Sequence, residues 1–442
     1  MKRACLVVSA MALILSTMSP ATNAGGGPNF TRFVGVGDSL TAGFKDGALF
    51  ADGQSTGFYP RLATSMGTQV VLPSIAYPGI PTPNPAAGAG LLLQIPGTCQ
   101  VGATTFATGV TTGRLDPTMP ATDVAIPGQN MSEALTSKWA IDPANPAGTA
   151  DTAEDFVLGF PYAFLPAPAN TPRSQIETAV GLQPTFLTIW LGSNDALGAA
   201  LAATVDDTTL TPVADFRSNA DTVFAALAGT GAEAVVLNVP DVTVIANLFS
   251  VTELSALTGL DAAQIKLLFG VQKDAFVPLS ALPTIQAIAG GSQQGPLAPN
   301  QILTRKEVKK IRKNVKQYNA KLRALADANG WAFVDVNAIL TDIAKNGFAI
   351  AGVGTVTTDY LGGLFGLDGV HPSATGHAIV ASAVIDSINA KYGTSLAKPN
   401  LAAIAAADPQ VCMAKSAQTA TLADLVKYAP AARAAESVIL NR

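Results

Sequence analysis

Ser39 is the first residue along the chain whose neighbouring sequence suits a catalytic role. It follows the segment Thr31 to Gly37, a short apolar run that ends in glycine and is typical of a buried strand. A serine placed just after such a strand, where a helix begins, presents its hydroxyl group at the carboxyl edge of a sheet. A hydroxyl group in that place can act as a nucleophile if a base lies within hydrogen-bonding distance.

A nucleophilic serine commonly uses a histidine as its base, and the chain contains only two histidines, His371 and His377. Asp368 precedes His371 by three residues, Gly369 lies between them, and Pro372 follows. This spacing lets a carboxylate bind one nitrogen of the imidazole ring while the other nitrogen faces outward as a base. We therefore predict that His371 is the base and Asp368 its orienting acid. His377 lies inside the next expected helix and is predicted to be structural.

A third polar segment, Gly192-Ser193-Asn194-Asp195, follows the apolar run Thr185 to Leu191. By itself it is also what an ordinary turn contains, because all four residue types suit turns.

Two other interpretations of the segment around Ser39 fail. A dinucleotide-binding fingerprint needs a third glycine where Leu40 stands, and the hydrolase motif G-x-S-x-G needs a glycine where Thr41 stands.

Taken together, these segments resemble the GDSL-type SGNH hydrolases, a family of lipases and esterases. The resemblance extends from about Phe33 to Tyr392, and the segments that correspond to blocks one, three and five of the family are Gly37-Asp38-Ser39-Leu40, Gly192-Ser193-Asn194-Asp195 and Asp368-Gly369-Val370-His371. Asp123 to Gly128 is similar to block two, with Asp123 where asparagine is common. The segment Ile75 to Gly79 is an alternative for that block.

The resemblance implies a serine ester hydrolase that forms an acyl-enzyme on Ser39, with His371 as base and Asp368 as orienting acid. It implies an oxyanion hole made of the backbone N–H groups of Ser39 and Gly128 and the side-chain amide of Asn194. Each such donor stabilises a transition state by about 3 kcal/mol. No metal ion and no organic cofactor is expected.

Apolar runs that suit buried strands alternate with segments of helical periodicity. The expected strands are 31–37, 185–191, 233–239 and 331–336, and the expected longer helices are 213–228, 304–329 and 373–392. Buried strands that alternate with helices predict an α/β fold, a three-layer α/β/α sandwich around a mainly parallel sheet. The resemblance specifies the flavodoxin-like arrangement of the SGNH hydrolases, with long loop and helical insertions.

Composition excludes two classes of protein. Hydrophobic residues make up 48% of the 442 residues, which excludes intrinsic disorder. The formal net charge of -4 argues against nucleic acid as a partner. Nine basic residues lie between Arg305 and Arg323, but they alternate with apolar residues at helical spacing, so we expect the solvated face of an outer helix.

The domain organisation expected from the sequence has three parts. Residues 1–24 have the basic start and apolar middle of a secretory signal peptide, with cleavage expected after Ala24, so we expect a secreted or periplasmic protein with no membrane-spanning segment in the mature chain. Residues 25–395 form the catalytic domain, with a loop-rich insertion at 80–184 and a helical, lid-like insertion at 244–300. Residues 396–442 form an Ala-rich tail with little apolar periodicity.

The cysteines fit an exported protein. Cys5 leaves with the signal peptide, so Cys99 and Cys412 remain, and two cysteines in an oxidising compartment predict one disulfide bond. We expect this bond to hold the tail against the rest of the chain.

The substrate is expected to be a small-molecule or lipid ester, with the possibility of peripheral contact with lipid. Several apolar residues of the insertion favour acyl chains of lipid type, namely Leu248, Phe249, Leu254, Leu257, Leu267, Leu268 and Phe269. Two alternatives stay open: a carbohydrate-ester deacetylase of the same family, which predicts a polar and open cleft, and a secreted binding protein without catalysis.

Overall fold

The computed structural model describes residues 27–77, 79–80, 92–94, 101–103, 113–142, 144–145, 151–414 and 420–440. The expected signal peptide and Cys99 lie outside the described residues. The cleavage after Ala24 and the bond between Cys99 and Cys412 therefore stay predictions.

The centre of the molecule is a parallel sheet with the strand order β1-β4-β5-β8. Its strands are β1 (Phe33–Gly37), β4 (Phe186–Trp190), β5 (Glu233–Leu237) and β8 (Ala332–Val334). Every neighbouring pair is parallel. These are the four strands that the apolar runs predict, and they are almost completely buried because helices cover both faces of the sheet.

The segment 122–126 extends the sheet beyond β1. Gly35 forms a parallel bridge with Asp123, and hydrogen bonds join this segment to Gly35 and to the carbonyl of Gly37. Among the strands of the central sheet, 122–126 follows β1 in the chain and precedes β4, and it pairs with the outer side of β1. The order of strands along the sheet is therefore that of a flavodoxin-like fold. In such sheets the order reverses beside the first strand, and ligands bind there at the carboxyl ends of the strands. Ser39 lies at this point.

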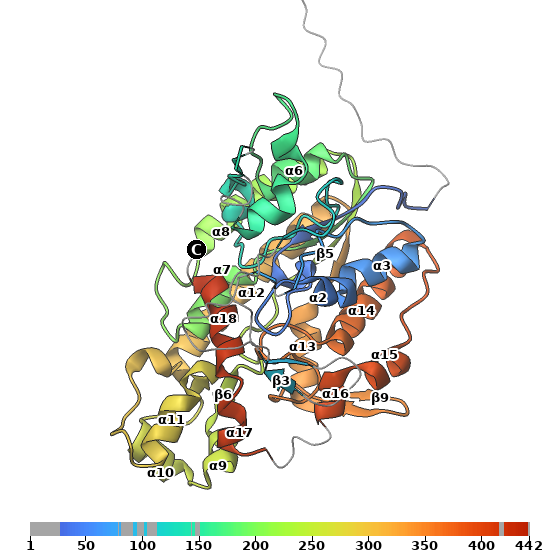
Figure 1. Ribbon diagram of the computed structural model, residues 1–442. Coiled ribbons are helices and arrows are strands. Elements are labelled where there is room, and N and C mark those ends of the chain that lie inside the picture. Colours follow the sequence, from blue (N-terminus) through green and yellow to red (C-terminus); the bar gives the residue numbers. More distant parts are fainter. Residues whose placement is uncertain are drawn as a thin grey trace, which may run out of the picture.

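Helices cover the two faces of the sheet (Figure 1). One face carries α3 (Phe58–Met66) and α14 (Ala374–Tyr392), which contact each other, and α14 also contacts β8. The other face carries α7 (Asn194–Leu201), α8 (Val213–Ala228) and α12 (Arg305–Ala328). The periodicity of the sequence predicts α8, α12 and α14 correctly. The buried stripe of α12 includes Val308, Ile311 and Val315, so its basic residues lie on the outer side.

Shorter elements connect these layers. The helices are α1 (Ser39–Ala42), α2 (Ala51–Thr56), α4 (Glu133–Thr136), α6 (Gln175–Gly181) and α13 (Val336–Asn346), with a π-helical turn at Asp155–Gly159 and 3₁₀ turns at Tyr162–Phe164 and Pro299–Gln301. Two antiparallel hairpins are β2 (Leu92–Gln94) with β3 (Val101–Ala103) and β9 (Phe348–Ile350) with β10 (Gly354–Val356). No described helix combines the length and apolar character that crossing a membrane requires.

The segment 80–184, expected to be a loop-rich insertion, also contains regular helices. Helix α6 lies within it and begins with a capping box, in which Ser174 accepts a hydrogen bond from the N–H of Glu177 and the side chain of Glu177 accepts one from the N–H of Ser174. This pair of residues is a signal for a helix start that can be seen in the sequence.

The insertion 244–300 packs against the last two helices of the C-terminal tail (Figure 1). The insertion contains β6 (Leu248–Ser250), α9 (Val251–Thr258), α10 (Ala262–Phe269), β7 (Phe276–Pro278), a 3₁₀ turn (Leu279–Ala281) and α11 (Leu282–Ala289). The tail contains α15 (Leu401–Ala407), α16 (Pro409–Ala414), α17 (Leu422–Val426) and α18 (Ala429–Leu440). Helix α17 contacts α11, and α18 contacts the 3₁₀ turn and α7.

The tail has a packing face although its sequence shows little apolar periodicity. Ala429, Ala431, Ala432 and Ala435 of α18 are buried. A face built from alanines gives a weak hydrophobic pattern in the sequence, yet it lets a helix approach its neighbours closely because the side chains are small.

Candidate active site

Ser39 is the first residue of α1, and Asp38 alone separates it from the end of β1. Asp38 caps this helix, because its Oδ1 atom accepts a hydrogen bond from the N–H of Leu40 at 3.0 Å. Burial raises the pKa of Asp38 to about 6, although the hydrogen bond from the N–H of Leu40 acts in the opposite direction. The aspartate thus fixes the turn that places Ser39 at the carboxyl end of β1.

His371 and Asp368 lie in the loop that precedes α14, and they are joined as the sequence predicts. Nδ1 of His371 lies 2.9 Å from Oδ2 of Asp368. Nε2 of His371 is buried and has no hydrogen-bond partner among the described residues. The ring packs against Phe44, with ring centroids 4.5 Å apart. One nitrogen is thus held by the carboxylate, and the other is available to a hydroxyl group.

The carboxylate of Asp368 is buried but well supplied with donors. Its Oδ1 atom accepts hydrogen bonds from the N–H groups of Val370 at 2.8 Å and His371 at 2.9 Å, and its Oδ2 atom accepts one from the N–H of Gly47 at 3.0 Å. Burial alone would raise the pKa of Asp368, but the adjacent His371 and these donors outweigh burial, so the pKa lies below its usual value. The group is therefore a stable anion that can orient the imidazole ring.

Gly128 lies in a tight turn at the end of the segment that pairs with β1. The N–H of Gln129 donates to the carbonyl of Ile126 at 3.2 Å, and Gly128 has a φ of +80°. Proline at 127 followed by glycine at a positive φ is the pattern of a type II turn. The structure thus places Asp123 to Gly128 beside β1, whereas Ile75 pairs with Arg114, away from that strand.

Asn194 begins α7 and is tied to the turn at Gly128. Its Nδ2 atom donates a hydrogen bond to the carbonyl of Gln129 at 2.9 Å, which uses one of the two amide hydrogens. The next residue, Asp195, accepts a hydrogen bond from the N–H of Met131 at 2.9 Å. The two segments that would supply oxyanion donors are thus fixed to one another.

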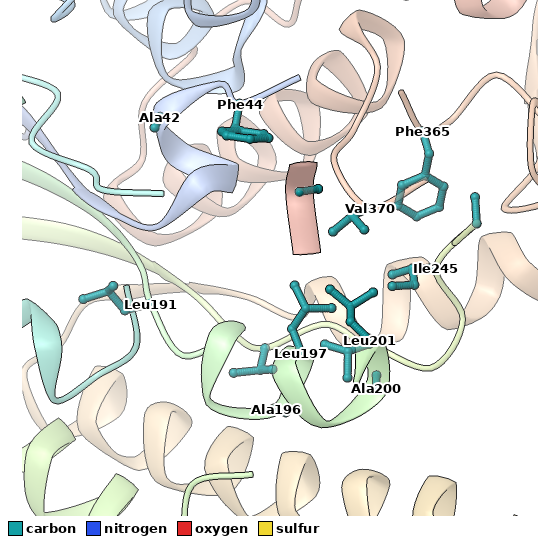
Figure 2. Packing of buried hydrophobic residues seen from close by; sticks show 14 of the residues in the cluster. Ala42, Phe44, Leu191, Ala196, Leu197, Ala200, Leu201, Ile245, Phe365 and Val370 are labelled. Atoms are coloured by element: carbon teal, nitrogen blue, oxygen red, sulfur yellow. The ribbon is translucent and has the colours of Figure 1, made fainter. Parts of the chain in front are cut away.

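Ser39, Asn194 and His371 line the same cavity, which has a volume of about 90 Å³. The rest of its wall is almost entirely carbon. Helix α13 contributes Val336, Ile339, Leu340 and Ile343, α14 contributes Ile379 and Val380, and further wall residues are Leu197, Ile245, Phe365 and Val370. Figure 2 shows these last four gathered from α7, the 245 region and the loop of His371. The nucleophile candidate therefore opens onto an apolar cavity.

The insertion contributes less to this cavity than its composition suggests. Among the described residues of 244–300, Ile245 alone lines it. Leu254 and Phe269 are buried within the insertion, whereas Leu267 is 81% exposed on α10. The largest share of the apolar wall comes instead from α13, which the sequence does not mark as part of the site.

Two buried glutamines, Gln129 and Gln175, support the site and were not predicted from the sequence. Nε2 of Gln175 donates to the carbonyl of Gly37 at 2.8 Å and to Oε1 of Gln129 at 3.1 Å. Gln175 thereby links the end of β1, just before Ser39, to the turn that contains Gly128. Glutamines carry no motif of their own, and only the capping box of α6 hints at this region.

His377 lies on α14 and is buried, as expected for a structural residue. Its ring stacks near Phe58, with centroids 6.3 Å apart. Burial lowers the pKa of His377 to about 3, so the residue is neutral at ordinary pH. Among the described residues, no cluster of three His, Cys, Asp or Glu side chains is arranged to hold a metal ion.

The fold is a parallel sheet with helices on both faces, in which Ser39 and His371 line one cavity and Asp368 is hydrogen-bonded to His371. The chain belongs to the GDSL-like Lipase/Acylhydrolase family, whose model matches residues 33–384. It is therefore a carboxylic ester hydrolase.

Two solved structures that the chain resembles are a variant of Axe2, an acetyl xylan esterase from Geobacillus stearothermophilus, and the lipase/acylhydrolase from Enterococcus faecalis. The first is 12% identical, with 82% of this chain and 95% of that chain covered and a TM-score of 0.35. The second is 13% identical, with 84% of this chain and 100% of that chain covered and a TM-score of 0.32. A comparison with curated proteins finds no match.

Proposed function

We propose that the protein is a serine esterase that hydrolyses esters with apolar acyl chains through an acyl-enzyme on Ser39. The observation that carries this proposal is that Ser39 and His371 line one cavity, whose remaining wall is apolar. The held Nδ1 and the unpartnered Nε2 of His371 support its role as the base.

In this mechanism Nε2 of His371 takes the proton of the Ser39 hydroxyl as the serine oxygen attacks the ester carbonyl. Asp368 keeps the imidazole in the required tautomer and stabilises the imidazolium cation that forms. His371 then gives the proton to the leaving alcohol. In the second half, His371 activates a water molecule that attacks the acyl-enzyme and releases the acid.

The negative charge on the carbonyl oxygen needs donors that are already in place. We assign this role to the backbone N–H groups of Ser39 and Gly128 and to the second amide hydrogen of Asn194. The hydrogen bond from Asn194 to the carbonyl of Gln129 supports the assignment, because it orients the amide without using both of its hydrogens. The left-handed conformation of Gly128 also supports it, because it fixes the direction of the turn.

The apolar wall favours lipid-type acyl chains over acetyl groups on a carbohydrate, which would fit a polar and open cleft. A wall of aliphatic side chains stabilises a bound chain by about 0.8 kcal/mol for each methylene that leaves water. A binding protein without catalysis would have no use for a histidine held by a buried carboxylate beside a serine.

The experiment is a series of p-nitrophenyl esters with acyl chains from two to sixteen carbons, with Ser39→Ala as the blank. We expect kcat/KM to rise from acetate towards medium chains and the variant to be inactive. A preference for acetate would contradict the proposed substrate class, and an active Ser39→Ala variant would contradict the mechanism.

We also propose that the protein is exported and cut after Ala24. The basic residues Lys2 and Arg3, the apolar stretch that follows them and the small residues before the cut support this proposal. The mass of the protein recovered outside the cytoplasm tests it, because the mature chain would start at Gly25.

A further inference from the structure

Resting on the proposed function, we propose that Asp46 is a positioning residue that holds the loop of Asp368 and His371 in its working geometry. Asp46 lies only a few residues beyond α1 in the chain, yet its partners come from the other end of the sequence. Its side chain does not line the cavity, so it would act through the backbone of the loop and not on the substrate.

The backbone around Asp46 is a tight two-residue turn. Lys45 and Ala48 exchange both backbone hydrogen bonds, at 3.0 and 3.1 Å, and the two residues between them have φ values of +53° for Asp46 and +91° for Gly47. Two positive φ values in a row define a type I′ turn, for which Asp-Gly is a favoured pair. The turn points both its backbone and its carboxylate at the same target.

That target is the loop that contains Asp368. The N–H of Gly47 donates to Oδ2 of Asp368 at 3.0 Å, the same oxygen that binds Nδ1 of His371. Oδ1 of Asp46 accepts a hydrogen bond from the N–H of Leu367 at 2.6 Å. One turn therefore fixes the carboxylate of Asp368 and the backbone directly before it.

The remaining polar groups of the loop are also held, so the geometry around Asp368 is tightly determined. The carbonyl of Leu367 accepts a hydrogen bond from the hydroxyl group of Tyr360 at 2.6 Å. The carbonyl of Asp368 accepts one from Nδ2 of Asn247 at 2.9 Å. Within this set, the carboxylate of Asp46 holds the N–H of Leu367, and without it this buried donor would lose its partner.

The C-terminal tail contacts the turn formed by Asp46 and Gly47. Nε2 of Gln410, in α16, donates to Oδ1 of Asp46 at 3.4 Å. Helix α18 covers Gly47 so closely that a Cβ atom at this position would lie 2.8 Å from the carbonyl oxygen of Ala431. Asp46 is buried, and burial raises its pKa to about 6, with Lys45 acting in the opposite direction. The tail thus takes part in positioning Asp368.

The test uses two substitutions that keep the turn, of which only one retains an acceptor oxygen for the N–H of Leu367. Asp46→Gly adopts the positive φ without strain but lacks the acceptor for the N–H of Leu367. Asp46→Asn keeps an acceptor oxygen and is also tolerated at positive φ. Asp274→Gly is the matched control, because Asp274 has a φ of +63° but lies exposed, with an ion pair of 3.5 Å to Arg305.

We expect kcat of Asp46→Gly to fall about tenfold to a hundredfold with KM unchanged, which is the cost of displacing a catalytic group by about 1 Å. Asp46→Asn should recover most of that loss, and Asp274→Gly should behave as the wild type. If Asp46→Gly lowers the melting temperature but keeps kcat for the folded protein, the residue is structural and the proposal is overturned.

A second measurement does not depend on turnover. The chain has two histidines, so ¹⁵N spectra of the imidazole rings can follow the tautomer of His371. The proton should stay on Nδ1 in the wild type and in Asp46→Asn, and Asp46→Gly should give a mixture of tautomers. An unchanged ring spectrum in Asp46→Gly would refute the proposed role of Asp46, whether or not the wild-type protein hydrolyses esters. Failure of the wild-type protein to hydrolyse any ester would by itself refute only the proposed function.

Discussion

Leu340 offers a direct test of the acyl cavity. It is half-buried on α13 and lines the cavity together with Ile339 and Ile343. If the acyl chain lies along this wall, each methylene that leaves water contributes about 0.8 kcal/mol, or about a fourfold increase in kcat/KM. Octanoate has four more methylenes than butyrate, so the wild-type ratio between the two esters should approach roughly two hundredfold at most.

Leu340→Trp should remove this preference, because an indole ring would occupy much of a cavity of about 90 Å³. The assay is kcat/KM for p-nitrophenyl acetate, butyrate and octanoate. Hydrolysis of the acetate should stay near the wild-type rate, and the advantage of octanoate over butyrate should largely disappear. Leu267→Trp, at an exposed position of α10 that does not line the cavity, is the control. A Leu340→Trp variant with the wild-type ratio would refute the assignment of this wall to the acyl chain.

Two further predictions concern stability. Burial raises the pKa of Asp195 to about 7 from 3.8, so its contribution to stability is present at low pH and is lost as the pH rises through about 7. Asp195→Asn should therefore raise the melting temperature more at pH 8 than at pH 5, by an amount equivalent to at most roughly 3 kcal/mol, because about two pH units of the shift lie between these values. Equal effects at both pH values would contradict this. The second prediction is a Cys99–Cys412 bond, which contributes at most about 5 kcal/mol. Alkylation of exported protein without reductant should leave both cysteines unmodified, and two alkylated cysteines would exclude the bond.

The elements that carry the candidate site follow from local patterns. The apolar runs before Ser39 and Asn194 predict β1 and β4, because strands buried on both faces contain few polar residues. The spacing of Asp368 and His371 predicts their hydrogen bond, because they lie three positions apart in one loop. In each case the information lies within a few neighbouring residues.

The supporting residues could not be predicted in this way. Asp46 and Leu367 are 321 positions apart in the chain, as are Gly47 and Asp368. The Asp-Gly pair is a visible turn signal, but nothing in the sequence indicates which loop that turn contacts. The same limit explains Gln175, whose partners Gly37 and Gln129 belong to other segments.

The acyl wall and the tail show a second limit. An apolar residue that lines a cavity looks the same in a sequence as one that packs in the core. No sequence pattern therefore distinguishes α13 from the apolar residues of the insertion as the wall of the cavity. Helix α18 packs through alanines, which give little contrast in hydropathy. Only the three-dimensional arrangement separates these cases.

The central claim is that Ser39 is the nucleophile, and covalent labelling tests it most directly. A fluorophosphonate probe reacts with an activated serine, and peptide mass spectrometry then identifies the residue that carries the label. We predict stoichiometric labelling at Ser39, none in Ser39→Ala, and a strong reduction in His371→Ala, which keeps the hydroxyl group but lacks the base. Labelling of a different serine, or hydrolysis by Ser39→Ala at the wild-type rate, would contradict the account.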